Sequence, residues 1–230
     1  MAEEGERQLT NTRSAGANLV IVDYGAGNLR SVAKALEKLG AAPLVTSSAE
    51  RVESASLLVL PGVGAAADTM RSLARLGLVE PIRRFVASGR PFFGVCLGLQ
   101  VLLDGSEEGG WQECFGLIPG IVRRFPPPDR VGGPLLKVPH MGWNRVRQRA
   151  DHPVFADIPD GAYFYFVHSY FAEPRDRSTV VGETEYGVTF PSVLVRDNVI
   201  ATQFHPEKSG DLGLRLYANF LAWGRGQRTN

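Results

Sequence analysis

The first half of the chain alternates short apolar runs with longer stretches in which apolar residues recur at helical spacing. The runs are rich in β-branched or aromatic side chains, which is typical of buried strands. We place such strands at 19–22, 57–60 and 91–95, and a further short strand at 44–45. The amphipathic stretches predict helices from a cap at Asn28 to about Leu39, where Gly40 ends the helix, and at 65–73, 79–87 and 97–103. Strands that alternate with helices predict a parallel sheet covered on both faces.

The second half has a different pattern, with several predicted strands and few helices between them. These strands lie at 122–125, 143–146, 161–171, 179–183 and 192–203. Pro126-Pro127-Pro128 marks a loop, and the last helix is expected at 212–223. The fold class predicted from both halves is a three-layer α/β/α sandwich. Its central sheet is mainly parallel and carries a mixed β extension.

Composition narrows the class of protein. The chain has 230 residues, which suits one domain, expected at 18–226 between a flexible extension at 1–17 and a tail at 227–230. The net charge of +1 gives no basic field for nucleic acid. The sequence holds no apolar run of the ~20 residues that a membrane helix needs and no apolar signal core. Two cysteines make no disulfide framework, so we expect a cytoplasmic protein.

Gly94-Val95-Cys96-Leu97-Gly98 is the most informative short motif. It lies where a predicted strand meets a predicted helix, and it has the glycine–x–nucleophile–x–glycine form of a nucleophile elbow. A helix N-terminus favours the thiolate form of a cysteine, and the Leu97 N–H can face a developing oxyanion. The alternative for Cys96 is a buried structural cysteine. Cys114 has no such surroundings and is predicted to be a packed side chain.

A cysteine nucleophile needs a base, and the base needs an orienting acceptor. His205 follows an apolar strand, and Glu207 stands two residues later, close enough to accept an imidazole N–H. His152 is expected at the surface, while His140 and His168 lie in aromatic surroundings and are expected to pack or to line a pocket. No histidine or cysteine pair has the spacing of a metal site, and no cofactor is expected.

Pro61-Gly62-Val63-Gly64 ends the strand expected beside the nucleophile strand. Glycines allow positive φ angles and a close approach to a ligand, so free N–H groups of this loop can bind an oxyanion. By itself the motif is also ordinary turn chemistry.

The segments 61–64, 94–98 and 205–207, in this order and separation, resemble the class I, triad-type glutamine amidotransferases. The resemblance covers nearly the whole chain after residue 17. It implies a glutaminase that uses Cys96, His205 and Glu207, with Leu97 and the Val63-Gly64 part of the loop as oxyanion donors. It also implies that substrate glutamine is held by Gly62, Gln100, Glu108, Ser169 and Tyr170. Gln100 as a helix residue and Glu108 as a solvated acid are the alternatives.

Four further segments are similar to the glutaminase subunits of imidazole glycerol phosphate synthases: 23–32, 139–144, 166–170 and 205–209. Asp104-Gly105 departs from that family, where an aromatic residue and an acid are expected. The resemblance implies a heterodimer with a (β/α)₈ barrel cyclase subunit and activation by that partner. The expected interface residues are Asn28, His140, Met141, Trp143 and Lys208, although core packing of Trp143 is nearly as plausible from the sequence.

Two other functions remain open at this point. A glutaminase of another synthase, such as pyridoxal phosphate synthase, would share the triad but not the 23–32 and 139–144 segments. A non-enzymatic binding or redox-sensing protein could keep an elbow cysteine on a similar fold. Such a protein has no need of His205-Pro206-Glu207 at a distant strand exit, so the sequence favours an enzyme.

Overall fold

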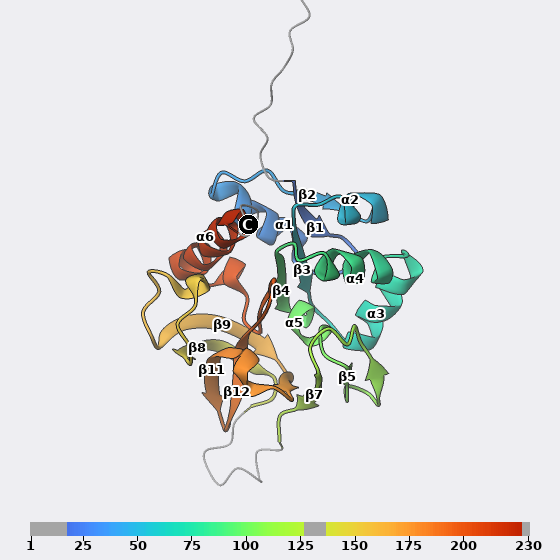
Figure 1. The fold of residues 1–230 in the computed structure, drawn as a ribbon. Helices are drawn as coiled ribbons and strands as arrows, with labels where there is room; N and C mark the ends of the chain where they lie inside the picture. Colours follow the sequence, from blue (N-terminus) through green and yellow to red (C-terminus); the bar gives the residue numbers. More distant parts are fainter. Residues whose placement is uncertain (1–17, 127–136, 227–230) are drawn as a thin grey trace, which may run out of the picture.

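The structure is a computed structural model that describes residues 18–126 and 137–226. The expected extension at 1–17, the tail at 227–230 and most of the triple-proline loop lie outside the described residues. Within the described part, a nine-stranded sheet runs through the molecule (Figure 1). Its strands are, in spatial order, β2 (Leu44–Thr46), β1 (Leu19–Val22), β3 (Leu57–Gly62), β4 (Phe92–Cys96), β13 (Val199–Thr202), β12 (Val188–Arg196), β11 (Val180–Tyr186), β8 (His140–Gln148) and β9 (Ala162–His168).

The sheet changes character at β13. From β2 to β13 neighbouring strands are parallel, and from β13 to β9 they are antiparallel. A smaller sheet in the described part lies beside it. Its strands are, in spatial order, β10 (Tyr170–Pro174), β7 (Gly120–Arg124), β5 (Gly105–Ser106) and β6 (Gln112–Glu113). The predicted fold class is therefore confirmed, and the mixed extension is resolved into these two parts.

Alternation along the first strand shows how the layers form. Val20 and Val22 belong to one apolar cluster, together with side chains of α2 (Ala49–Glu53), α3 (Ala66–Arg75) and α4 (Val79–Ala87). Leu19 and Ile21 belong to the other cluster, with α1 (Leu29–Lys38) and the C-terminal α6 (Gly210–Gly226). Successive strand residues point to opposite faces, so helices cover both sides of the parallel half (Figure 1).

Three local predictions need correction. The helix expected at 97–103 is only α5 (Leu97–Gln100), because the carbonyl groups of Val101 and Leu103 accept N–H groups from the 115–116 segment instead. The run 161–171 is two strands in different sheets, since the Ser169 carbonyl between them accepts the N–H of Phe125.

The run 192–203 is likewise two antiparallel strands, β12 and β13, with Asp197 at φ 50° in the turn between them.

At the start of α1, Asn28 occupies the cap position but its side chain makes no capping hydrogen bond.

Candidate active site

Cys96 stands at the junction of β4 and α5, as the motif predicts. Its φ angle is 54°, in the left-handed region that a non-glycine residue rarely adopts. In the sheet register Gly62 is opposite Cys96, and Thr202 of β13 is opposite Val95. The ends of β3, β4 and β13 therefore meet around the cysteine, and the loop at Val63 and the exit towards His205 lie on either side of it. Carboxyl ends of parallel strands are where α/β folds build their sites.

The glycines of the elbow are required by close contacts. A Cβ atom on Gly98 would lie 1.9 Å from the carbonyl oxygen of Leu60, and one on Gly94 would lie 2.6 Å from the carbonyl oxygen of Gly98. Gly62 is restricted as well, since a Cβ atom there would lie 2.8 Å from both the Leu97 Cβ and the Tyr24 hydroxyl. These contacts press α5 against β3 and β4, so the backbone at Cys96 has no freedom to relax its unusual φ angle.

His205 and Glu207 form a buried pair. Nδ1 of His205 lies 2.9 Å from Oε1 of Glu207, and the two side chains are 2% and 1% exposed. The second carboxylate oxygen is 3.5 Å from the hydroxyl of Tyr217 on α6, which donates to it. Nε2 of His205 is buried and makes no hydrogen bond to the described residues, so it is the nitrogen left for the cysteine. The predicted base and its orienting acid therefore lie together in the fold.

Burial lowers the pKa of His205, but its interactions with Cys96 and Glu207 outweigh burial and raise the pKa from 6.5 to about 9. Since Nε2 has no hydrogen-bond partner, its interaction with the Cys96 sulfur is looser than an ordinary hydrogen bond. Catalytic contacts often tighten only when substrate is bound. The raised pKa favours the doubly protonated, imidazolium form of His205.

The expected oxyanion donors surround the same sulfur. Leu97 is the first residue of α5, where an N–H group has no partner within the helix. Because α5 has only four residues, its dipole adds less than the sequence pattern implies. Gly64 has φ +102°, and Val63 is 40% exposed at the cavity. Both the loop and Leu97 line one cavity, and the loop passes close to Leu97.

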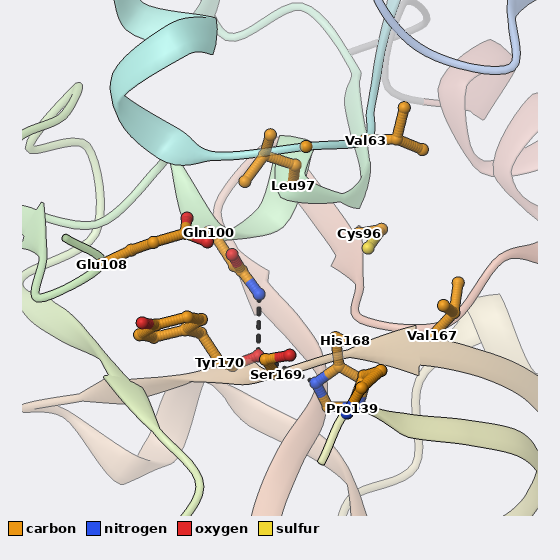
Figure 2. A pocket seen from close by; sticks show the side chains of 11 residues that line it. Val63, Cys96, Leu97, Gln100, Glu108, Pro139, Val167, His168, Ser169 and Tyr170 are labelled. Atoms are coloured by element: carbon orange, nitrogen blue, oxygen red, sulfur yellow. Dashed lines mark hydrogen bonds between the residues drawn. The ribbon is translucent and has the colours of Figure 1, made fainter.

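That cavity is about 330 Å³, within the size range of small-molecule sites. Figure 2 shows Cys96 directed into it from above and the strand residues 167–170 forming its floor. It is lined by Val63, Gly64, Cys96, Leu97, Gln100, Glu108, Pro139, Val167, His168, Ser169 and Tyr170. Every expected oxyanion and substrate residue except Gly62 is in this set. Gly62 instead ends β3 under the loop, next to the buried Tyr24 ring.

Two of the expected substrate residues already have partners. Gln100 is 4% exposed, and its amide nitrogen donates to the Tyr170 carbonyl at 2.8 Å and to Oε1 of Gln203 at 3.1 Å. Oε2 of Glu108 accepts the Ala66 N–H at the start of α3, at 3.0 Å. For a ligand, Gln100 therefore keeps its single side-chain oxygen, and Glu108 keeps Oε1.

Gln203, Tyr217 and Val167 were not found by sequence reasoning. Gln203 precedes His205 by two residues, just after β13, where the chain bends. Its position near the expected base was the available signal for Gln203, whereas nothing in the sequence connects Tyr217 or Val167 to the site.

His140 and His168 lie next to each other, with Nδ1 of His140 at 3.0 Å from Nε2 of His168, a hydrogen-bonding distance. Nδ1 of His168 donates to the Tyr170 carbonyl at 2.8 Å, so its Nε2 accepts from Nδ1 of His140. Burial lowers the pKa of His140 to about 4 and that of His168 to about 3. Both rings are therefore neutral, as their aromatic surroundings predict, and His168 also lines the cavity. Cys114 is buried, and burial raises the pKa of its thiol to about 12.

The expected interface residues separate into two groups. Met141 and Trp143 are 63% and 56% exposed on the outer face of β8, so the core-packing alternative for Trp143 is wrong. Lys208 is exposed beside them, with its Nζ 5.7 Å from the ring centroid of Tyr165. Asn28 is partly exposed at the start of α1.

His140 does not belong to that outer face. It is 3% exposed and held by His168, so it cannot touch a partner directly without rearrangement, which corrects the expectation. His152 is also less exposed than expected, because its ring packs 6.1 Å from the ring of Trp223.

The departure at Asp104-Gly105 has a structural explanation. Asp104 accepts the Gly120 N–H at 3.0 Å and pairs with Arg175 at 3.3 Å. The ring of Trp111 covers Gly105 so closely that an added Cβ would lie 2.5 Å from it. The departure from the family at these two positions is therefore accommodated by contacts around the smaller sheet.

No cluster of three or more histidine, cysteine or acidic side chains in the described part is arranged to hold a metal ion. Across residues 18–126 and 137–226, no helix has the length and apolar character needed to cross a membrane.

The fold and the site geometry agree with the family that the sequence matches. The family described as glutamine amidotransferase class-I matches residues 20–222, and the chain belongs to that family. Two solved structures share the fold at low identity. One is described as a glutamine amidotransferase (TM-score 0.69, 20% identity, 90% of this chain and 100% of that one). The other is PurLQS from Thermotoga maritima (TM-score 0.68, 19% identity, 90% and 99%).

Much closer relatives carry one name, imidazole glycerol phosphate synthase subunit HisH. The protein from Chloroflexus aurantiacus is 50% identical over 208 residues, which cover 89% of this chain and 95% of that one. The one from Dehalococcoides mccartyi is 49% identical, over 91% and 99%. The one from Syntrophotalea carbinolica is 52% identical, over 88% and 98%.

Proposed function

We propose that this chain is the glutaminase subunit of an imidazole glycerol phosphate synthase. It hydrolyses glutamine to glutamate and ammonia and supplies the ammonia to a cyclase subunit in histidine biosynthesis. The observation that carries the proposal is Cys96 at the cavity with the buried His205–Glu207 pair behind it, in a chain about half identical to HisH subunits along most of its length. Glutaminases of other synthases share the triad, but the relatives above favour this one.

The arrangement supports a thioester mechanism. Nε2 of His205 takes the proton of the Cys96 thiol, and the resulting thiolate attacks the side-chain carboxamide carbon of glutamine. The carbon–nitrogen bond then breaks as His205 returns that proton to the departing nitrogen, which leaves as ammonia. Water attacks the glutamyl thioester, glutamate leaves, and the thiol is restored. Glu207 holds the imidazole so that Nε2 faces the sulfur.

The negative charge of each tetrahedral intermediate needs donors placed before it forms. The N–H of Leu97 and those of Val63 and Gly64, which line the same cavity, are our candidates. The free oxygens of Gln100 and Glu108, with Ser169 and Tyr170, are suited to hold the amino-acid end of glutamine. In this proposal Gly62 acts only by letting the loop pass close to Leu97.

A docked partner explains the exposed apolar face of β8 and β9. Met141 is opposite Val167 in the register, and Val167 lines the cavity, so this face is continuous with the cavity wall. Aromatic residues and methionine are enriched in interface cores. The partner proposed here is a (β/α)₈ barrel cyclase, with Met141, Trp143, Lys208 and Asn28 at the contact.

Ammonia released into water would be protonated and lost as a nucleophile, so a cover over the cavity serves the reaction. The cyclase would use the ammonia to convert phosphoribulosyl-formimino-AICAR phosphate into imidazole glycerol phosphate and AICAR. In this proposal the chain alone is nearly inactive, and a peptide flip near Val63, which the flanking glycines permit, completes the oxyanion hole when the partner binds its nucleotide.

The test measures glutamate release from glutamine by the purified chain, first alone and then with the cyclase and its nucleotide ligand. Strong stimulation that disappears in Cys96→Ala and persists in Cys114→Ala is the expected result. Cys114 is the matched control, because it is the second buried thiol of the chain and does not line the cavity. Full activity without a partner would remove the dependence on the cyclase, and inactivity under both conditions would favour another synthase or a non-enzymatic role.

A further inference from the structure

Gln203 makes a contact with the nucleophile that the mechanism above does not use. Its side chain is fully buried, at 0% exposure. Its amide nitrogen lies 3.6 Å from the Cys96 sulfur, a hydrogen-bonding distance for an N–H donor and sulfur. The residue follows β13 and comes two positions before His205, so both residues reach the cysteine from the same strand exit.

The neighbouring groups fix which end of the Gln203 amide faces the sulfur. A backbone carbonyl only accepts hydrogen bonds, so the Gln100 atom that lies 2.8 Å from the Tyr170 oxygen must be its NH₂ group. The second hydrogen of this group is directed at Gln203, and the atom that receives it at 3.1 Å must be Oε1. The NH₂ group of Gln203 is then left facing Cys96. The reverse orientation would set two NH₂ groups against each other.

We infer that Gln203 is a further catalytic residue, whose amide N–H stabilises the Cys96 thiolate, and that Gln100 is a positioning residue that holds this amide in place. The contact of Gln203 with the thiolate does not depend on the proposed function, whereas its role in the glutaminase reaction does. Hydrogen bonds to a charged acceptor are about twice as strong as neutral ones. The Gln203 amide therefore favours the thiolate both before attack and when it leaves the thioester.

This arrangement also redefines Gln100. Both hydrogens of its amide are used within the protein, one by the Tyr170 carbonyl and one by Gln203. Figure 2 shows the Gln100 side chain reaching across the cavity to the Tyr170 backbone. Gln100 can therefore hold a substrate only through its side-chain oxygen. This oxygen is an acceptor, so it suits a donor such as the ammonium group of an amino acid.

The experiment measures the rate at which iodoacetamide alkylates Cys96 in the full chain as a function of pH, without glutamine or partner. A Cys114→Ala background leaves Cys96 as the labelled cysteine. Gln203→Met keeps the length of the side chain but removes the donor. We expect its alkylation rate at neutral pH to fall by about tenfold or more, with the midpoint of the profile moved to higher pH, because a charge-assisted hydrogen bond is lost.

Gln203→Glu is the second variant, since it keeps the acceptor for Gln100 and replaces the donor to sulfur by a negative oxygen. It should move the midpoint further than Gln203→Met. Gln112→Met is the control, because this side chain hydrogen-bonds only its neighbour Glu113 and should leave the profile unchanged. Circular dichroism establishes which variants fold.

An unchanged midpoint in whichever Gln203 variant folds would overturn the inference, even if the chain proves to be a cyclase-stimulated glutaminase. Conversely, a shifted midpoint stands even if the partner assignment fails. With the cyclase present, the same variants should lower kcat for glutamine and leave KM nearly unchanged. A variant that raises KM alone would assign Gln203 to substrate binding and contradict the role proposed here.

Discussion

The buried His168 ring should make the chain sensitive to mild acid. Burial is the main cause of its low pKa, about 3 against 6.5 for a free histidine, and nearby His140 and His205 lower it further, while the Tyr170 carbonyl partly opposes them. Between these two pH values the unfolded chain binds a proton that the folded chain does not. Stability therefore falls as the pH drops below 6.5, and the loss stops growing below the folded pKa.

The size of the effect follows from the same two values. At pH 4.5 the unfolded histidine is almost fully protonated and the folded one almost neutral. The difference from pH 7 is about 2.5 kcal/mol, at about 1.36 kcal/mol for each pH unit crossed. The ring is 6% exposed, so solvent screening does not reduce this figure much. Such a loss is a large fraction of the ~5–15 kcal/mol that stabilises a typical domain.

The assay is urea unfolding at pH 7 and at pH 4.5, for the natural chain and for His168→Asn. The variant should be less stable at pH 7, because it loses packing and a hydrogen bond, but it should lose less on acidification, by about the 2.5 kcal/mol assigned to the ring. Subtracting the two pH-dependent losses removes the contribution of the carboxylates. Equal losses in both proteins, or a His168 ring that NMR finds protonated in the folded chain near pH 6, would refute the reasoning.

Two further predictions concern the elbow and the exposed face. Gly98→Ala places a methyl group 1.9 Å from the Leu60 oxygen and should lower the melting temperature sharply or prevent folding. Gly226→Ala, where no atom of the described residues lies within 4 Å of the added methyl, should change it far less, and equal melting curves would contradict the packing argument. Trp143→Ala removes a side chain that is 56% exposed, so thermal melting of the isolated chain should change little. Glutamate release stimulated by the cyclase should fall in Trp143→Ala, and unimpaired stimulation would exclude this face as the contact.

The parallel half of the fold was predictable because its signals are local. Each buried strand is a short apolar run, and each is followed by glycine or by a helix pattern, so element type and order follow from residues close together in the chain. The elbow was predictable for the same reason. Both of its glycines are visible in the motif, although the contact that requires Gly98 is with Leu60 of the neighbouring strand β3.

The antiparallel half was harder to predict because its turns are less marked. Nothing in the pattern separates β12 from β13, since the turn at Asp197 and Asn198 is polar for only a few residues within an apolar run. The prediction of a helix at 97–103 was wrong for a different reason. Leu99 and Leu103 have helical spacing, but the carbonyl groups of Val101 and Leu103 accept hydrogen bonds from a segment more than ten residues further along the chain. Tertiary hydrogen bonds therefore overrode a correct local pattern.

The site shows the same limit at the level of single side chains. The three motifs end neighbouring strands, and Cys96 and His205 were found from their residue types and their positions at strand exits. Gln100 and Gln203 are 103 positions apart, and Gln203 and Cys96 are 107 apart. Their contacts depend on rotamers set by the Tyr170 carbonyl, which belongs to the smaller sheet. The smaller sheet therefore helps to orient the Gln203 amide that faces the Cys96 sulfur, although it contributes no residue to the triad.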